Sequence, residues 1–447
     1  MKIAFYSTGG MSPDSAFTPA LTFFPKRAAL WDDLADRYKD HTIDVYVVLP
    51  ATHLIDSRGT KVLARPERVN YHILPQEASI DEIAGIIAAD RPDCAVAYSL
   101  PDAALDWNPV RDAMVGLRLA KAGIRVLSHG KKTAMNCFKK YDTNRIVRNA
   151  GFNTATGVYV QGLLYYSDRR NPEINHNVYK EFLRDQIDLL DFPVVVKPAA
   201  GSGSVGISIA NDTDEVLRQL DSIDAECDMV VEEKVEGYNF GIEIYGTPGY
   251  YAVTEPVMFS MTGDGVTDPF ASVKYGPVDH EKYRVDLLKK EMVELAEKMS
   301  FCGIAEIDLI FSGNKWYVIE INPRFSLLSA VGCAMREENM FEALMRLATG
   351  TVPVIDGDKN LCALDFKSGV LDDDKIEEVV NNCDSIKSVM KFECRVAEGV
   401  DVGYCEWVMA GRSREELAAA MAAVGKAYPD IMTDAVRESA GQLGVRS

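Results

Sequence analysis

The chain has 447 residues, of which 47% are hydrophobic and 26% are charged, a composition typical of an ordinary globular protein. At roughly 150 residues per domain, this length predicts about three domains with a core that needs no disulfides or structural metals. The 48 basic and 67 acidic residues give a net charge of −19. This charge argues against a general nucleic-acid binder and against docking on anionic membranes, because both need a basic surface. An anionic nucleotide can still bind through local donors and a metal ion.

The nine cysteines are scattered and never spaced as CxxC, so they predict neither a disulfide framework nor a zinc site. We interpret them as reduced thiols of a cytoplasmic protein. The apolar run at the N-terminus breaks at Gly9 and Gly10, which is too short for a signal peptide. No stretch approaches the roughly 20 apolar residues that span a bilayer. The expected location is therefore the cytoplasm.

Residues 1–128 are predicted to form an α/β domain. Apolar runs with the length of buried strands occur at 2–7, 43–49, 94–98 and 124–127. Helical patterns lie between them at 79–89 and 110–122. Strands that alternate with helices indicate a parallel sheet with crossovers. We therefore expect a small doubly wound domain here.

Residues 129–350 are predicted to form a second, α+β domain. A basic amphipathic helix is expected at 133–150, ending at Gly151, and a long helix at 281–299. Strands are expected at 192–197, 207–210, 229–233, 240–245 and 251–258, and a hairpin at 305–311 and 316–321. From about residue 351 the pattern changes to strands at 361–367, 389–393 and 404–410 and an alanine-rich helix at 413–427. Residues 351–447 therefore read as a small α+β domain.

A glycine- and serine-rich stretch, PAAGSGSVG at 198–206, follows the strand that carries Lys197. Glycines let a backbone approach a ligand closely, and successive N–H groups form a nest for an anion. The stretch lacks the GK[ST] of a P-loop and leads into a strand, so the Rossmann fingerprint does not fit either. A turn whose glycines serve only geometry is the alternative. The candidate phosphate-binding positions are Lys197, Gly201, Ser202, Gly203, Ser204 and Val205.

The hairpin GIAEIDLIFSGNKWYVIEINPRF, residues 303–325, carries a cluster of acidic residues. With its turn near Gly313 and Asn314, Asp308 and Glu320 are predicted to lie nearly opposite each other. Alternation by two puts four side chains on one face: Glu306, Asp308, Glu320 and Asn322. Like charges about 5 Å apart across strands repel, and Mg²⁺ would remove that repulsion. Apolar neighbours on both strands argue against a solvated face. Arg324 has the same parity and suits a phosphate or a carboxylate.

The order and spacing of these pieces resemble the ATP-grasp superfamily, of the carboxylate-amine ligase type that includes D-alanine–D-alanine ligase and L-amino acid ligase. The similar segments are VVVKP, AAGSGSVG, VVEEKVEG, IDLIF and YVIEINPRFS. The resemblance covers about residues 129–350, and it implies an ATP-grasp fold with a nucleotide and magnesium site between two α+β lobes. Residues 1–128 look like the Rossmann-like domain that precedes it. Residues 351–447 are loosely similar to the closing domain, mainly through GYCEWVMAGRSREEL.

The resemblance implies roles for individual residues in nucleotide binding. Lys140, or the adjacent Lys139, would be the first nucleotide lysine, and Lys197 would hold the α- and β-phosphates. In the segment VVEEKVEG, Glu232 would accept a hydrogen bond from the adenine amino group, with backbone contacts from Glu233 and Val235. Asn239 stands where the family usually has a glutamate for the ribose.

The resemblance also implies the chemistry of the reacting end. Asp308, Glu320 and Asn322 would bind Mg²⁺, or Mn²⁺ in its place. Lys274 would reach the γ-phosphate from a lid at 259–277, and Arg324 would hold the acyl phosphate or the carboxylate substrate. A second departure from the family is Leu327, where many relatives have glycine.

We therefore expect an ATP-dependent ligase that activates a carboxylate as an acyl phosphate, joins it to an amine and releases ADP and phosphate. The substrates would be small and amino-acid-like, and the family makes a homodimer a reasonable expectation. Three alternatives stay open: a thiol acceptor, an ATP-dependent carboxylase acting through carboxyphosphate, and a nucleotide-binding module without catalysis.

Overall fold

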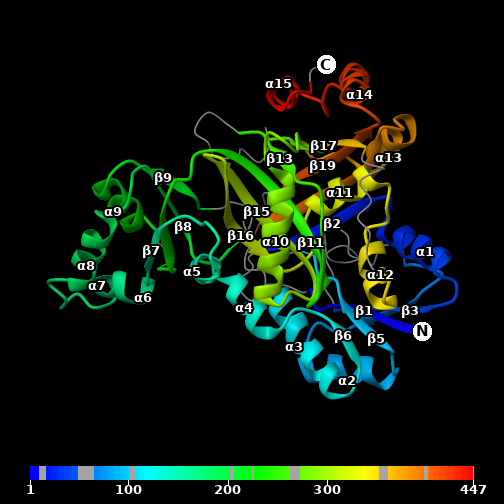
Figure 1. Cartoon of the computed structure of the whole chain (residues 1–447), viewed down its shortest axis with the longest axis horizontal. Helices are drawn as coiled ribbons and strands as arrows, with labels where there is room; N and C mark the ends of the chain where they lie inside the picture. The colour runs from blue at the N-terminus through cyan, green and yellow to red at the C-terminus, as the bar shows by residue number, and fades with distance from the viewer. Residues whose placement is uncertain are drawn as a thin grey trace.

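The computed structural model of the chain describes residues 1–9, 17–48, 65–100, 107–201, 206–223, 226–261, 272–351, 361–396 and 401–445 (Figure 1). The predicted phosphate-loop positions Ser202, Gly203, Ser204 and Val205 and most of the predicted lid lie outside these residues. Among the described helices, none combines the length and apolarity of a membrane-spanning segment. The cysteine side chains that are described are all unpaired thiols.

The N-terminal segment forms a five-stranded parallel sheet in the order β4-β3-β1-β5-β6. Its strands are β1 (Lys2–Ser7), β3 (Thr42–Val48), β4 (Asn70–Leu74), β5 (Cys94–Ala97) and β6 (Arg125–Leu127). The helices of this segment are α1 (Arg27–Arg37), α2 (Ile80–Ala89) and α3 (Asn108–Lys121). Alternate residues of β1 enter apolar clusters on the two faces, Phe5 on one and Tyr6 on the other. This confirms the predicted doubly wound parallel sheet, to which β4 and α1 are additions.

The expected helix at 133–150 is wrong as a single element. The chain forms α4 (Lys131–Phe138) and α5 (Lys140–Asn149), separated by Lys139 in an extended conformation with φ −105° and ψ 113°. The break lets α5 begin in a new direction, so that its first residue, Lys140, is buried.

A small lobe, residues 157–233, projects to the left in Figure 1. Its four-stranded antiparallel sheet has the order β7-β10-β8-β9. The strands are β7 (Gly157–Val160), β8 (Val194–Pro198), β9 (Ser208–Ala210) and β10 (Met229–Glu233). The helices are α6 (Gly162–Tyr165), α7 (Ser167–Arg170), α8 (Val178–Ile187) and α9 (Thr213–Asp221). One apolar cluster joins the sheet to α6, α8 and α9, which fixes the strand ends that carry Lys197 and Glu232.

The centre of the molecule is a ten-stranded sheet, called the large sheet below. Its order is β16-β15-β11-β13-β14-β17-β19-β18-β2, with β12 paired to β11. The strands are β2 (Phe17–Phe24), β11 (Tyr238–Thr247), β12 (Tyr250–Val253), β13 (Val257–Phe259), β14 (Lys274–Gly276), β15 (Gly303–Ser312), β16 (Lys315–Asn322), β17 (Cys362–Ser368), β18 (Ile386–Val396) and β19 (Asp401–Gly411). It joins strands from all three predicted domains, whose boundaries stay a prediction.

Helices cover both faces of the large sheet. One face carries α10 (Val285–Met299), α13 (Asp373–Asn382), α14 (Arg414–Ala427) and α15 (Asp434–Gln442), which share two apolar clusters with the strands. The opposite face carries α11 (Leu328–Arg336), and α12 (Glu342–Thr349) packs against the N-terminal domain. At Gly241 a Cβ atom would lie 2.8 Å from Leu328 Cδ2, so this glycine allows the close approach of α11. The face under α11 is the one that carries the candidate site.

Candidate functional site

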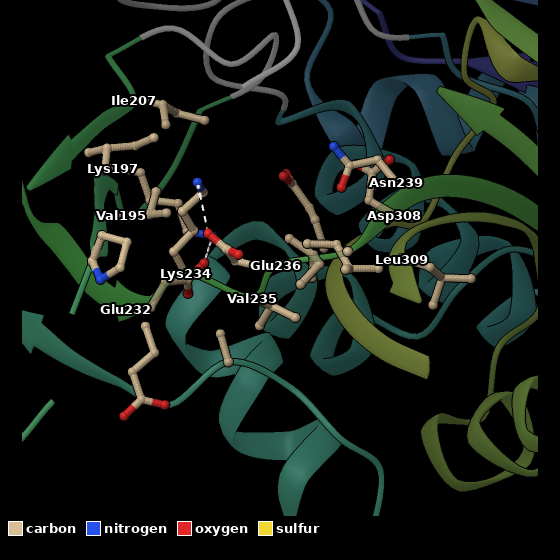
Figure 2. A pocket seen from close by; sticks show the side chains of 18 of the residues that line it. Val195, Lys197, Ile207, Glu232, Lys234, Val235, Glu236, Asn239, Asp308 and Leu309 are labelled. Atoms are coloured by element: carbon tan, nitrogen blue, oxygen red, sulfur yellow. Dashed lines mark hydrogen bonds and ion pairs between the residues drawn. The ribbon is translucent and has the colours of Figure 1, made fainter. Parts of the chain in front are cut away.

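A cleft of about 1030 Å³ lies between the small lobe and the large sheet. Figure 2 shows its labelled side chains, with Val195, Lys197 and Glu232 on the small-lobe side and Asp308 and Asn239 on the opposite side. Eight predicted site residues line the cleft: Lys140, Lys197, Glu232, Glu233, Val235, Asn239, Asp308 and Glu320. The structure therefore brings together residues that are far apart in the sequence.

A β-bulge puts the acidic residues of the hairpin on one face. The turn at Gly313 and Asn314 has positive φ at both residues, 53° and 61°, and Ser312 pairs with Lys315. In a regular two-residue hairpin this pairing would set Asp308 opposite Ile319 and send Glu320 to the other face. The register shifts beside Asp308, so that Ile319 is the additional residue and Asp308 pairs with Glu320. The predicted opposition is confirmed, but it depends on this bulge.

Burial and mutual repulsion act on the carboxylates of the hairpin. Burial raises the pKa of Asp308 well above its ordinary value, and the nearby Glu306 and Glu320 raise it further. The pKa of Glu306 is also raised, mainly by burial. A carboxylate with a raised pKa binds a proton, or another cation, more readily than one in water. The hairpin therefore presents a place where positive charge is stabilised.

Two basic side chains occupy this place in the structure. Lys140 Nζ lies 2.8 Å from Glu320 Oε1 and donates to the carbonyl of Gly201 at 2.5 Å. Arg324 donates to Asn322 Oδ1 at 3.2 Å, while Asn322 Nδ2 donates to Glu306 Oε2 at 2.7 Å. The described residues hold no ready-made cluster of three or more His, Cys, Asp or Glu side chains around one point. The carboxylates of Asp308 and Glu320 and the amide oxygen of Asn322 suit Mg²⁺, provided that Lys140 and Arg324 move away from these oxygens.

Lys140 connects the acidic hairpin to the predicted phosphate-binding loop. Gly201, which ends the described part of this loop, has φ 130°, a conformation that favours glycine. The carbonyl of Gly201 and the carboxylate of Glu320 both accept hydrogen bonds from the ammonium group of Lys140. The N–H of Lys140 in turn donates to the carbonyl of Ala199 at 2.9 Å. Lys140 thus joins the start of α5, the glycine-rich loop and the acidic hairpin.

Lys197 and Glu232 form an ion pair on adjacent strands of the small lobe, with both side chains only 5% exposed. Glu232 also accepts from Asn144 Nδ2 at 3.0 Å. Both of its carboxylate oxygens therefore have partners, and the proposed contact with an adenine amino group must share them. In the next residues, the N–H of Glu233 donates to Thr156 at 2.8 Å, so Val235 is the better placed source of a backbone contact.

Four predicted site residues of the described part of the chain lie outside the cleft lining. Asn322 and Gly201 border a small adjoining pocket together with Glu320, and Arg324 lies beside Asp112 and His129 in another. Lys274 is on β14, where its ammonium group contacts Glu406 at 2.7 Å and Asp365 at 3.3 Å. The side chain of Lys274 nevertheless lies on the face of the sheet that borders the cleft, because its register partner on β13 is Phe259, which lines the cleft.

Sequence reasoning missed the two acidic partners of Lys274. Asp365 and Glu406 are each 2% exposed, on β17 and β19. An acidic residue within an otherwise apolar strand, as in CALDFKS and GYCEWVMAG, is the signal that would have found them.

Comparison with known sequences identifies one part of the chain as an ATP-grasp domain. Residues 140–327 match a family described as the ATP-grasp domain. The chain is 28% identical over 170 residues to carbamoyl-phosphate synthase of Methanobrevibacter smithii, covering 37% of this chain and 45% of that protein. It is 23% identical over 188 residues to D-alanine–D-alanine ligase of Bacillus anthracis, covering 42% and 54%. The chain thus spans about half the length of the curated relatives it matches.

Comparison with solved structures extends the similarity of fold to nearly the whole chain. The crystal structure of L-amino acid ligase from Bacillus licheniformis aligns with a TM-score of 0.62 at 16% identity, covering 94% of this chain and 95% of that one. The chain therefore contains an ATP-grasp domain, with an α/β domain before it and α+β structure after it. The recognition made from the motifs is confirmed.

Proposed function

We propose that this protein is an ATP-dependent ligase that joins a carboxylate to an amine and releases ADP and phosphate. The observation that supports this most directly is the arrangement at the cleft floor. Asp308 and Glu320 oppose each other there, and Lys140 links Glu320 to Gly201 of the phosphate loop. A phosphoryl-transfer site needs this combination of oxygen ligands and cations, because its main tasks are positioning and charge stabilisation.

The residues have distinct tasks in the proposed reaction. Lys197 holds the α- and β-phosphates, and Asp308, Glu320 and Asn322 hold Mg²⁺, which supplies charge neutralisation at the phosphates. A carboxylate oxygen of the substrate attacks the γ-phosphorus and ADP leaves. The amine then attacks the acyl carbon, phosphate leaves and the amine nitrogen gives up a proton. Arg324 steadies the carboxylate and Lys274 the transferring phosphoryl group.

Product analysis tests this proposal. The purified protein is incubated with ATP and Mg²⁺ against pools of small carboxylic acids, amines, amino acids and bicarbonate, and ADP is measured separately from AMP. We expect ADP and phosphate only when an acid and an amine are both present. ADP formed with bicarbonate alone would favour a carboxylase, and AMP would contradict an acyl phosphate. The homodimer is proposed on the family resemblance, and the cytoplasmic location on the scattered cysteines, which suit reduced thiols.

A further inference from the structure

A second pocket, of about 270 Å³, lies on the α11 side of the large sheet. Its floor consists of the neighbouring strands β17, β19, β18 and β2, and the start of α1 and α11 cover it. Glu406, Met390 and Phe23 are register partners in one row across the last three of these strands. Adjacent strands lie about 4.8 Å apart, so this row is about 10 Å long. The pocket is therefore an elongated space between the sheet and two helices.

The guanidinium group of Arg27 is buried at the β2 end of this pocket without an acidic partner. The residue is 6% exposed, and its guanidinium stacks 3.8 Å from the ring centroid of Phe23. In the described part of the chain it donates to the neutral sulfur of Met340, and its Nε has no acceptor there. Burial lowers the pKa of Arg27 to about 10, and no carboxylate of the described residues acts to raise it. A buried cation without a counter-ion is costly, so this group is suited to receive an anion.

The acidic residues that line the pocket away from its mouth have partners of their own. Asp365 and Glu406 share the ammonium group of Lys274 and are hydrogen-bonded to each other. Glu338 pairs with Arg336 at 2.8 Å. The other charged lining residues are exposed and mark the mouth toward solvent: Glu337 and Lys387. Among the described lining residues, the buried charge that awaits a partner is therefore the guanidinium at the β2 end.

The surface between Arg27 and the acidic pair is apolar, and the volume of the pocket limits the size of a ligand. Side chains from α11, its preceding turn and the strands form this surface: Leu327, Ala330, Ala334, Val389 and Val408. A cavity of about 150 Å³ holds benzene. By that measure, the pocket of about 270 Å³ holds roughly eleven non-hydrogen atoms. A ligand that fills it carries one anionic group on an apolar body.

We propose that this pocket binds a monocarboxylate of about nine carbons, with its carboxylate on the guanidinium group of Arg27 and its apolar body along Met390. One cation neutralises one negative charge, so a carboxylate suits this end better than a doubly charged phosphate. The strand β2 is four strands from β14, about 19 Å along the sheet. The carboxylate at Arg27 is therefore an anchor and not the group activated beside Lys274. This second ligand site goes beyond the proposed ligase function and does not depend on it.

Calorimetric titration of the full chain without ATP tests this site separately from catalysis. The probes are nonanoate and 3-phenylpropanoate, each beside its uncharged amide, and acetate, which lacks the apolar body. We expect at least one of the two larger acids to bind, and its amide to bind about tenfold or more weakly, because the charge-assisted contact with Arg27 is lost. Acetate should bind at least about 100-fold more weakly than that acid, because it buries few apolar atoms. Binding by neither acid, or equal affinity of the acid and its amide or of the acid and acetate, would overturn the proposal.

Substitutions assign the two parts of the ligand to the two parts of the pocket. Arg27→Met should weaken binding of the acid about tenfold or more and leave binding of its amide unchanged. The matched control Lys387→Met removes an exposed cation of the same pocket and should change neither. Ala330→Leu fills the apolar part from α11 and should weaken the acid and the amide alike. Equal loss of acid and amide in Arg27→Met, with thermal unfolding as in the wild type, or loss of the acid in Lys387→Met instead, would refute the assignment.

The ligase proposal and the pocket proposal fail in different ways. If an apolar monocarboxylate binds as described but no acid and amine release ADP, the ligase function falls and the pocket stands. If an acid and an amine release ADP while neither larger probe binds, the pocket assignment falls and the ligase function stands. Release of ADP from nonanoate and an amine would place the carboxylate of nonanoate in the nucleotide cleft and refute its role as an anchor at Arg27.

Discussion

The ion pair between Lys197 and Glu232 gives a prediction that separates stability from nucleotide binding. Both side chains are 5% exposed, and apart from Lys197 the carboxylate has one neutral donor, Asn144. Lys197→Met keeps the apolar stem and removes the charge, which leaves the carboxylate buried and nearly alone. Removing one partner of a buried pair costs about 3–5 kcal/mol, so we expect the free energy of unfolding to fall by that amount.

A second substitution should restore stability but not function. Replacing a buried ion pair by apolar residues of similar volume is often neutral or stabilising by about 1–4 kcal/mol. The double variant Lys197→Met with Glu232→Leu should therefore recover most of the lost free energy. Its affinity for ATP should stay at least about tenfold below wild type, because the proposed charge-assisted contact of Lys197 with the phosphates is missing.

Guanidinium unfolding and calorimetric ATP titration measure the two effects. The control is Lys180→Met in the same lobe, whose ammonium pairs with Asp168 and Asp221 at the surface. Such a pair contributes about 1 kcal/mol or less, and ATP binding should not change. Wild-type stability of Lys197→Met would refute the burial argument. Wild-type ATP affinity of the double variant would refute the phosphate role of Lys197.

Three further predictions concern the acidic hairpin β15–β16, the N-terminal domain and β14. Glu320→Gln should lower Mg²⁺-dependent ATP turnover by about 100-fold or more, about 2.7 kcal/mol, because the proposed charged ligand is lost. The control Glu378→Gln, on the surface of α13, should leave turnover unchanged. Wild-type turnover in Glu320→Gln would mean that the hairpin has only a structural role. Burial raises the pKa of Asp112 to about 6. Its ionised form therefore lowers the free energy of unfolding by about 3 kcal/mol above pH 6, and this loss disappears as the pH falls toward 4. Asp112→Asn keeps an acceptor for Thr8 and should unfold at a higher temperature than wild type at pH 8. The difference in free energy of unfolding between variant and wild type should be about halved at pH 5. A difference that does not change with pH would contradict this. Lys274→Gln should lower ATP turnover more than ATP affinity, and equal losses in both would move Lys274 from the transition state to ground-state binding.

Much of the fold follows from local sequence patterns, because buried strands and amphipathic helices leave a periodic signal. The strands β1, β3 and β5 and the hairpin β15–β16 fall within a residue or two of the predicted ranges. The strand β2 was missed, since it contains Pro19 and pairs with β18 from the far end of the chain. Proline is tolerated there because β2 is an edge strand. No local pattern reports a partner so distant in sequence.

The candidate site was predictable where spacing within one motif decides the geometry. Asp308 and Glu320 belong to one hairpin, and the sequence placed them nearly opposite, although the bulge at Ile319 was not foreseen. Alternation by two assumes a regular ladder, so it gives no information on where an additional residue lies. The contact of Lys274 with two acids of the C-terminal strands depends on tertiary pairing across the large sheet, which composition and spacing do not encode.

The pairing of β2 with β18 has a consequence for how this protein is made. The segment FTPALTFF is synthesised about 370 residues before the strand that pairs with it, from Val389 to Val396. At usual rates of translation the delay is roughly 20 to 75 seconds. During that time an apolar strand has no partner, which exposes the nascent chain to association with other copies. Chaperone capture of the N-terminal fragment during synthesis is therefore expected, and its release should coincide with the emergence of residues 386–411.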